Sequence, residues 1–225
     1  METPHFTVER FGNEGQPVVV IDDFAASPDA LLETASHATF EKRGLFYPGI
    51  RAPANPQYLT EQGALIAQIL IEVFGFTKPA QLTECAYSLV TTKPQDLMPI
   101  QALPHYDGLE PQRLALLHYL SGPKTGGTAF YRHDATGFET VTELRFERYK
   151  QALSEEAAQN GLPPQDYCRD DLNGFTRIGT VAAKKNRLVI YRGITLHSGD
   201  IPKGLPFSTD PLRGRLTINS FLHEA

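Results

Sequence analysis

The chain has 225 residues, of which 41% are hydrophobic and 10% aromatic, enough for the core of one large domain. Its formal net charge of -5 offers no basic surface to a phosphate backbone, and no stretch approaches 18 consecutive apolar residues, so we expect neither nucleic-acid nor membrane binding. Two cysteines, Cys85 and Cys168, are too few for a disulfide framework or a thiolate cage, and the first 30 residues lack a secretory signal. We therefore expect two reduced thiols, with Cys85 buried in a strand, in a soluble cytoplasmic protein.

The first 80 residues combine one strand signal with two helix signals. The β-branched run PVVVIDDF at 17–24 predicts a short strand. Ser27, Pro28 and Asp29 have the order of an N-cap, a first helical position and a first-turn acid, so a helix is predicted to begin there. Three prolines make 45–58 a predicted loop, and an apolar stripe predicts a second helix over 60–76. Residues 1–80 are therefore predicted to be a helical support.

Strand patterns dominate the rest of the chain. From residue 82, apolar and polar residues alternate with the period of two of a half-buried strand. The predicted strands are 82–92, 113–120, 128–133, 175–183, 187–193 and 215–222. A charged helical pattern at 139–160 interrupts them and predicts an insertion over about residues 138–175. The prediction is a mainly β fold: a sandwich or barrel core over 81–222, with helices packed outside it.

The sequence Pro-His-Tyr-Asp-Gly at 104–108 is the first candidate for a functional site. At a strand end, the side chains of His105 and Asp107 point to the same face and start roughly 7 Å apart, since a strand rises about 3.3 Å per residue. Two histidines and one carboxylate on one face of an octahedron suit non-haem Fe(II) oxygenases. A site of this kind therefore needs a second histidine.

His197 is the favoured second histidine, because it lies at an edge between a strand and a turn, like His105. His133, which also follows a strand, is the competing ligand. His118 shares its strand face with leucines, which favours a hydrogen-bonded core histidine. The remaining histidines are predicted to be solvated or on a helix surface: His5, His37 and His223.

Five short motifs follow one another along the chain: HYD at 105–107, LALLHYLSG at 114–122, GGTAFY at 126–131, LHSG at 196–199 and GRLTINSFL at 214–222. Together they resemble the 2-oxoglutarate/Fe(II)-dependent oxygenase superfamily, and its prolyl 4-hydroxylase-like branch most closely. The resemblance covers about residues 80–222, and the strand and helix near the start of the chain resemble the usual entry to that fold. It implies a double-stranded β-helix core, jelly roll or cupin-like, with N-terminal helices and a helical insertion.

The resemblance also implies an activity. His105, Asp107 and His197 would hold Fe(II), with 2-oxoglutarate and O2 as co-substrates. In related halogenases a small residue replaces the carboxylate ligand, so the presence of Asp107 favours hydroxylation or another oxidation.

The far carboxylate of 2-oxoglutarate needs a fixed cation, because a buried anion without a partner is costly. Arg215 matches the position of the family's anchor, and Arg213, two residues earlier, is the alternative. The resemblance further implies that Tyr119 helps to hold this carboxylate and that Asn219 lines the same pocket.

The chain departs from the family pattern in two places. Arg215 lies 18 positions after His197, which predicts an extra loop near the site, and the insertion has no counterpart in the minimal fold. Insertions over a rigid barrel are where such scaffolds select substrates. The candidate substrate contacts that flank the site are Tyr106, Arg132, His133 and Arg192.

Several alternatives remain open from the sequence. The substrate could be a small molecule, an amino acid or a peptidyl residue, and a homo-oligomer is possible. Two other classes are a cupin-type metal-binding jelly roll with different chemistry and a non-catalytic binding module on the same fold. Arg215 discriminates between them, because without 2-oxoglutarate it would have no buried anion to bind.

Overall fold

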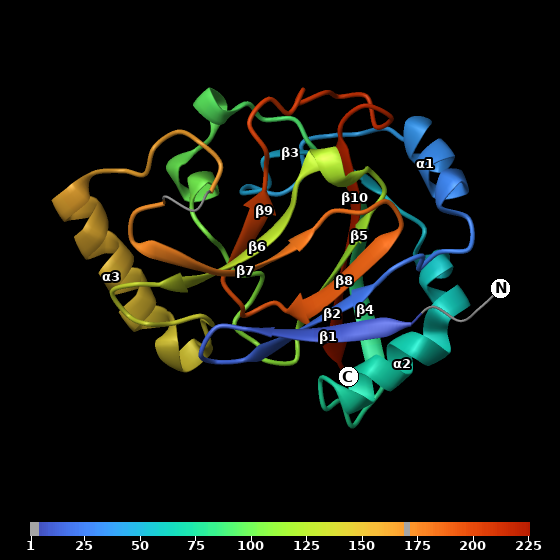
Figure 1. Cartoon of the computed structure of the whole chain (residues 1–225), viewed down its shortest axis with the longest axis horizontal. Helices are drawn as coiled ribbons and strands as arrows, with labels where there is room; N and C mark the ends of the chain where they lie inside the picture. The colour runs from blue at the N-terminus through green and yellow to red at the C-terminus, as the bar shows by residue number, and fades with distance from the viewer. Residues whose placement is uncertain (1–4, 169–171) are drawn as a thin grey trace.

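Two antiparallel sheets form the scaffold of the molecule (Figure 1). The computed structural model describes residues 5–168 and 172–225. The larger sheet has the strand order β1-β2-β8-β5-β10-β4-β3 and the smaller one β7-β6-β9. The strands of the larger sheet are β1 (Phe6–Phe11), β2 (Gln16–Ile21), β3 (Gly49–Pro53), β4 (Ala80–Val90), β5 (Leu114–Tyr119), β8 (Arg187–Arg192) and β10 (Arg215–Glu224). Those of the smaller sheet are β6 (Gly127–His133), β7 (Phe175–Ala182) and β9 (His197–Asp200).

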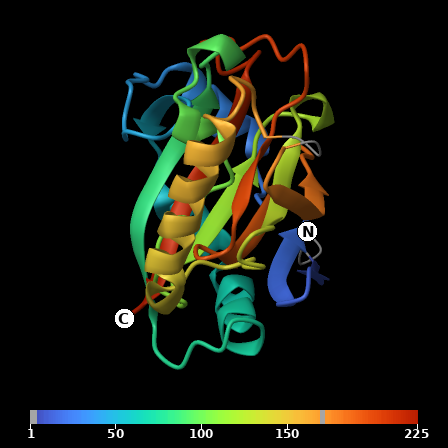
Figure 2. The same cartoon turned by 90° about the vertical axis from the view of Figure 1, so that its left-hand side faces the viewer.

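Helices cover the two sheets on opposite sides of the molecule. Helices α1 (Pro28–Ser36) and α2 (Gly63–Glu72) pack on the outer face of the larger sheet, where they share an apolar cluster with β2, β5, β8 and β10. Helix α3 (Glu143–Asn160) lies at the other side, against the smaller sheet (Figures 1 and 2). Four short 3-10 helices are η1 (Pro56–Gln62), η2 (Pro94–Asp96), η3 (Pro99–Ala102) and η4 (Pro123–Thr125).

A second apolar cluster fills the space between the sheets. Leu117 and Tyr119 of β5 face Phe130 of β6 there, together with valines of β2 and β8. Because β5 lies between β8 and β10 and is covered on both faces, all six of its residues are buried. This explains its continuously apolar sequence. The arrangement is a double-stranded β-helix with flanking helices, which confirms the predicted fold class.

The N-terminal region differs from the predicted helical support. It contributes β1, β2 and β3 as well as α1 and α2, and the segment 45–58 contains β3 rather than loop alone. Both β1 and β3 are edge strands, which pair on one side only and therefore need no strong apolar pattern. Proline is tolerated at such an edge, as Pro53 is at the end of β3. The second helix begins at Gly63, after a 3-10 turn, rather than at residue 60.

The insertion begins later than its charge pattern predicts. Glu139 is 1% exposed, Thr140 forms a β-bridge with Thr195, and the helix starts only at Glu143. Both cysteines are free thiols; Cys168 is buried, whereas Cys85 on β4 is half-buried. Among the residues that the structure describes, no helix is both long and apolar enough to cross a bilayer.

Candidate metal centre and adjoining cavity

His105 and His197 are cross-strand neighbours. Each donates its backbone N–H to the carbonyl of the other at 2.8 Å, and their ring centroids lie 4.3 Å apart. This double exchange is the hydrogen-bonded pair of an antiparallel ladder, in which opposite side chains lie on the same face. Two histidines 92 positions apart in the sequence are therefore held side by side by the backbone alone.

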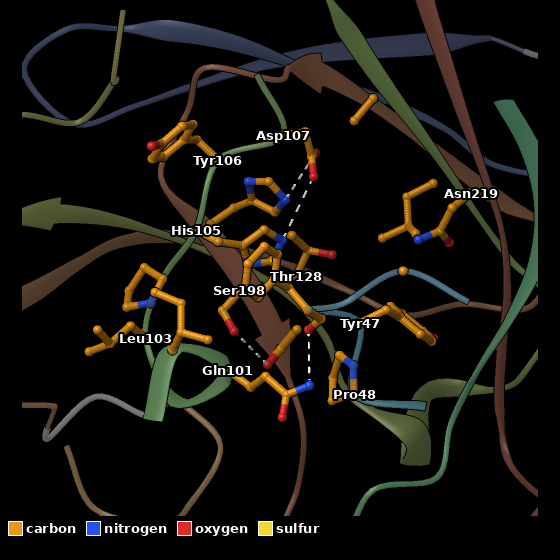
Figure 3. Close-up of a pocket in the computed structure, with 18 of the residues that line it drawn as sticks. Tyr47, Pro48, Gln101, Leu103, His105, Tyr106, Asp107, Thr128, Ser198 and Asn219 are labelled. Carbon is orange, nitrogen blue, oxygen red and sulfur yellow. Dashed lines mark hydrogen bonds and ion pairs between the residues drawn. The ribbon is translucent and has the colours of Figure 1, made fainter. Parts of the chain in front are cut away.

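Asp107 completes a cluster of three ligand-type side chains. Its backbone N–H donates to the carbonyl of Gly193 at 2.7 Å, which fixes the chain two residues beyond His105. One carboxylate oxygen lies 3.8 Å from His105 Nε2, and the other lies 3.4 Å from His197 Nε2 (Figure 3). The ligand atoms of all three side chains lie within 4.8 Å of one another, a spacing that one ion can bridge.

Both histidines direct Nε2 toward Asp107 in this cluster. His197 Nδ1 donates to the carbonyl of Thr195 at 2.8 Å, so the tautomer that this contact selects leaves the Nε2 lone pair for an ion. The side chain of His105 is 53% exposed where it borders the cavity. Desolvation of its partly enclosed ring, with His197 acting in the same direction, lowers the pKa of His105. Neutral imidazole and carboxylate are the forms that bind a divalent ion.

The other two histidines near the core have different partners. His118 is fully buried, and its Nε2 lies 3.0 Å from Asn186 Oδ1, as expected for a core histidine. His133 is also fully buried, with Nδ1 2.9 Å from Thr136 and Nε2 3.1 Å from Glu156 of α3. Because both of its nitrogens are engaged, His133 ties α3 to β6 and does not join the cluster of His105, Asp107 and His197.

A cavity of about 690 Å³ opens beside the three side chains. In Figure 3, Leu103 and Tyr106 lie on one side of the pair formed by His105 and Asp107, and Tyr47 and Asn219 lie on the other. The volume falls in the range of small-molecule sites and leaves room for more than an ion. The lining also includes Phe146, Tyr149, Lys150 and Leu153, so the insertion helix α3 forms one wall.

Arg215, the first residue of β10, is a buried cation in the wall of this cavity. It is 4% exposed, and its guanidinium carbon lies 5.6 Å from the centre of the Tyr119 ring. Nη2 donates to the carbonyl of Gly127 at 2.8 Å, but Nε has no hydrogen-bond partner. Among the described residues, no carboxylate forms an ion pair with Arg215. A buried charge in this state is costly unless an anion joins it.

The glycine pair at the start of β6 makes this position possible. Gly126 has φ +99°, and a Cβ there would overlap the backbone carbonyl of Asp200. A Cβ on Gly127 would overlap the carbonyl of Val181. The absence of both side chains lets β6 lie close to its neighbours, with the Gly127 carbonyl within reach of Arg215.

Of the other predicted co-substrate contacts, Asn219 lines the cavity, whereas Arg213 and Tyr119 do not. Arg213, the alternative anchor, is exposed in the turn before β10 and does not line the cavity, because the strand begins only at Arg215. Tyr119 is fully buried and donates to or accepts from the Thr128 hydroxyl at 2.6 Å, so Thr128 rather than Tyr119 lines the cavity. Asn219 lines the cavity as predicted.

Apart from His133, the predicted substrate contacts are Tyr106, Arg132 and Arg192, and of these only Tyr106 reaches the cavity. Tyr106 lines it, next to Tyr149 of α3. Arg132 instead lies 3.6 Å from the buried carboxylate of Glu139. Arg192 donates to backbone carbonyls on the outer side of the larger sheet, including that of Phe74 at 2.9 Å, so it has a structural role.

Three cavity residues had no signal in the sequence. Tyr47 has a buried hydroxyl near Ser88, and burial raises its pKa to about 12, so it is a neutral donor at physiological pH. Arg51 of the unpredicted strand β3 lies over the Tyr47 ring at 4.3 Å. Tyr191 of β8 packs edge-on against His197, with the ring centroids 4.7 Å apart. Their position depends on strand pairing over long sequence distances, which no local motif encodes.

The fold has parallels among solved structures. A double-stranded β-helix of two antiparallel sheets is the cupin-like fold of 2-oxoglutarate oxygenases. Residues 2–222 match the family described as "Family of unknown function (DUF6445)", and the chain belongs to that family. No curated protein matches the chain in sequence.

Solved structures share the fold at low sequence identity. The chain is similar to HygX from Streptomyces hygroscopicus, solved with nickel and 2-oxoglutarate bound, with a TM-score of 0.55 and 13% identity over 94% of this chain and 84% of that one. It is also similar to the non-heme alpha ketoglutarate dependent epimerase SnoN from nogalamycin biosynthesis, with a TM-score of 0.50 and 15% identity over 93% of this chain and 78% of that one.

Proposed function

We propose that this protein is a non-haem Fe(II)- and 2-oxoglutarate-dependent oxygenase. In this reaction O2 oxidises 2-oxoglutarate to succinate and CO2 and oxidises a C–H bond of a second substrate, by hydroxylation or another two-electron outcome. The proposal assigns His105, Asp107 and His197 as iron ligands and Arg215 as the anchor of the 2-oxoglutarate carboxylate. The narrower resemblance to the prolyl 4-hydroxylase-like branch, and the cytoplasmic location, stay predictions.

The single observation that carries the proposal is the buried guanidinium of Arg215 in the same cavity as the His-Asp-His cluster. A cupin-type metal site with other chemistry explains the cluster but leaves the buried charge of Arg215 without a counter-ion. A dicarboxylate that binds the metal at one end and Arg215 at the other accounts for both. Tyr47, with its buried hydroxyl, and Thr128 are further hydroxyl groups in the same wall.

The chain's own residues prepare this site in three ways. The hydrogen bond from His197 Nδ1 to the Thr195 carbonyl fixes the ring so that Nε2 faces the ion. Tyr191 packs against His197 and excludes water from that side of the cluster. Arg215 orients 2-oxoglutarate so that its oxo acid end reaches the metal. Iron, once bound, supplies the redox chemistry with O2.

The fold relatives support the class of reaction but leave its outcome open. HygX was solved with 2-oxoglutarate bound, whereas SnoN is an epimerase. At 13% and 15% identity neither identifies a substrate for this chain. Hydroxylation is therefore proposed as one of several oxidative outcomes. A binding module without catalysis is the second candidate, and the intact cluster of three ligand-type side chains favours the enzyme over it.

Succinate formation tests this function directly. The purified chain, incubated with Fe(II), 2-oxoglutarate, ascorbate and O2, is expected to produce succinate even without its substrate, as a slow uncoupled reaction. Asp107→Ala should lower the rate at least about 100-fold, because it removes one of three ligands, while circular dichroism and the melting temperature show that the fold persists. A rate unchanged in Asp107→Ala would refute the assignment of the metal site.

A further inference from the structure

The charges around the cavity are unequal. Four cationic side chains line it: Arg51, Arg113, Lys150 and Arg215. Arg51 is half-buried and paired with Glu84 at 2.9 Å, whereas Lys150 is an exposed side chain of α3, 58% accessible, beside Glu147. With Arg215 assigned to 2-oxoglutarate under the proposed function, one half-buried cation of the described lining remains without an ion-pair partner within 4 Å.

That remaining cation is Arg113, immediately before β5. Its guanidinium carbon lies 4.7 Å from the centre of the Phe221 ring, on the face of the larger sheet that borders the cavity. Its Nε is buried and has no hydrogen-bond partner, and no carboxylate of the described residues lies within 4 Å of its guanidinium nitrogens. A half-buried guanidinium without an anion is a recognition group for one.

Backbone contacts place Arg113 beside the candidate metal ligand Asp107. The carbonyl of Arg113 accepts from Gly193 N–H at 2.7 Å, and the carbonyl of Gly193 accepts from Asp107 N–H at 2.7 Å. A Cβ on Gly193 would lie 3.4 Å from Asp107 Cβ and 3.5 Å from Arg113 Cγ, so both side chains pass over this glycine. An anion at Arg113 would thus bind next to the metal cluster.

Asn219 supplies a second donor on the same face. It lies two residues before Phe221 on β10, so their side chains share one face of the strand. Its Oδ1 accepts from the Thr217 hydroxyl at 2.7 Å, and its Nδ2 has no partner among the described residues. The floor of the cavity between the metal cluster and β10 therefore offers donors rather than acceptors.

The mouth of the cavity has the opposite character. Leu45, Phe46 and Ile100 line it, yet they are 69%, 61% and 47% exposed. A hydrogen bond of 3.1 Å from Gln101 Nε2 to the Phe46 carbonyl joins the two segments that carry these residues. Exposed apolar side chains gathered at the entrance of a cavity mark a surface that an apolar ligand covers.

We propose that the substrate of this site is an amphipathic carboxylic acid whose carboxylate binds Arg113, with Asn219 as a second donor, and whose apolar part lies against Leu45, Phe46 and Ile100. A monoanion is favoured because, apart from Arg215, one half-buried cation of the described lining is left without an ion-pair partner. This inference rests on the proposed function, which assigns Arg215 to 2-oxoglutarate and the metal cluster to iron.

Calorimetric titration of the 225-residue protein tests the proposal. The three probes are octanoate, octanamide and octyl phosphate, which carry similar alkyl chains and differ in the head group. Each is titrated anaerobically with Fe(II) and saturating 2-oxoglutarate present. Octanoate is expected to bind at least about tenfold more tightly than octanamide, because hydrogen bonds to a charged group are stronger than those between neutral groups. It should also bind more tightly than octyl phosphate. Arg113→Gln should abolish the preference for octanoate over octanamide, and Arg113→Lys should restore part of it.

Arg213→Gln is the matched control, because it removes one exposed arginine outside the cavity and should leave the preference unchanged. Equal binding of octanoate and octanamide, or binding of none of the three probes, would overturn the proposal. A preference for octyl phosphate would also overturn the proposal, because it would indicate a dianionic substrate. Displacement of octanoate by 2-oxoglutarate would overturn it as well, because the octanoate carboxylate would then bind Arg215. Absence of the iron–2-oxoglutarate absorption band in the wild type refutes the proposed function separately. Octanoate titrated without iron still reports on Arg113 in that case.

Discussion

Replacing the buried cation of the cavity tests the co-substrate assignment most quantitatively. Arg215→Met keeps a side chain of similar length but removes the charge. It also removes Nε and Nη1, the nitrogens available to a carboxylate, because Nη2 already donates to the carbonyl of Gly127. Removing one partner of a buried ion pair costs about 3–5 kcal/mol, so the affinity for 2-oxoglutarate should fall at least roughly 150-fold.

The same substitution should have the opposite effect on the ligand-free protein. Arg215 is 4% exposed and has no carboxylate partner among the described residues, so its charge is desolvated without compensation. We therefore expect the free energy of unfolding of ligand-free Arg215→Met to equal or exceed that of the wild type. Only the wild type should gain stability from 2-oxoglutarate, by about 2.7 kcal/mol at a hundred times its dissociation constant.

Urea unfolding and calorimetry, both with Fe(II) under nitrogen, measure these two quantities. The control is Arg213→Met, which removes an exposed arginine two residues away and should alter neither quantity. Equal 2-oxoglutarate affinity in Arg215→Met and wild type would refute the assignment of the anchor. A larger loss in Arg213→Met than in Arg215→Met would refute it as well.

Two further predictions concern stability. Burial lowers the pKa of His118 from 6.5 to about 4, so the unfolded chain binds the proton more readily, and stability should fall by about 2 kcal/mol between pH 7.5 and pH 5. Urea unfolding of His118→Gln should show a pH dependence weaker by that amount, and an identical dependence in both proteins would contradict the prediction. Gly126→Ala should lower the free energy of unfolding by about 2 kcal/mol or more, because of its φ of +99° and the overlap with Asp200. Gly122→Ala, at a φ of -82° and with nothing within 4 Å, should stay within about 0.5 kcal/mol of wild type, and equal losses in both would count against the strain.

The sequence predicted those parts of the fold and site that short-range patterns encode. The alternating strands, the two apolar N-terminal stripes and the insertion helix follow from residue periodicity, and each appears within a few residues of its predicted position. The spacing of His105 and Asp107 placed both on one face, and the structure brings His197 against them.

What the sequence could not predict depends on long-range packing or on where a strand begins. The motif favoured Arg215 over Arg213 only by its match to the family's anchor position, and the start of β10 at Arg215 is what makes one exposed and the other buried. Arg51 reaches the cavity from an edge strand that lacks an apolar pattern. The sequence does not distinguish Arg113 from other residues that precede a strand. Its position over Phe221, and the lack of an ion pair within 4 Å among the described residues, appear only in the structure.

The most direct test of the central claim is an anaerobic titration of the Fe(II)-loaded protein with 2-oxoglutarate, followed by visible absorption. Chelation of iron by the oxo acid end of 2-oxoglutarate produces a charge-transfer band. We predict that the band appears and saturates at one equivalent in the wild type, and that Asp107→Ala and Arg215→Met shift its titration to much higher 2-oxoglutarate concentrations. A well-folded wild-type protein that binds Fe(II) but shows no such band would contradict the account.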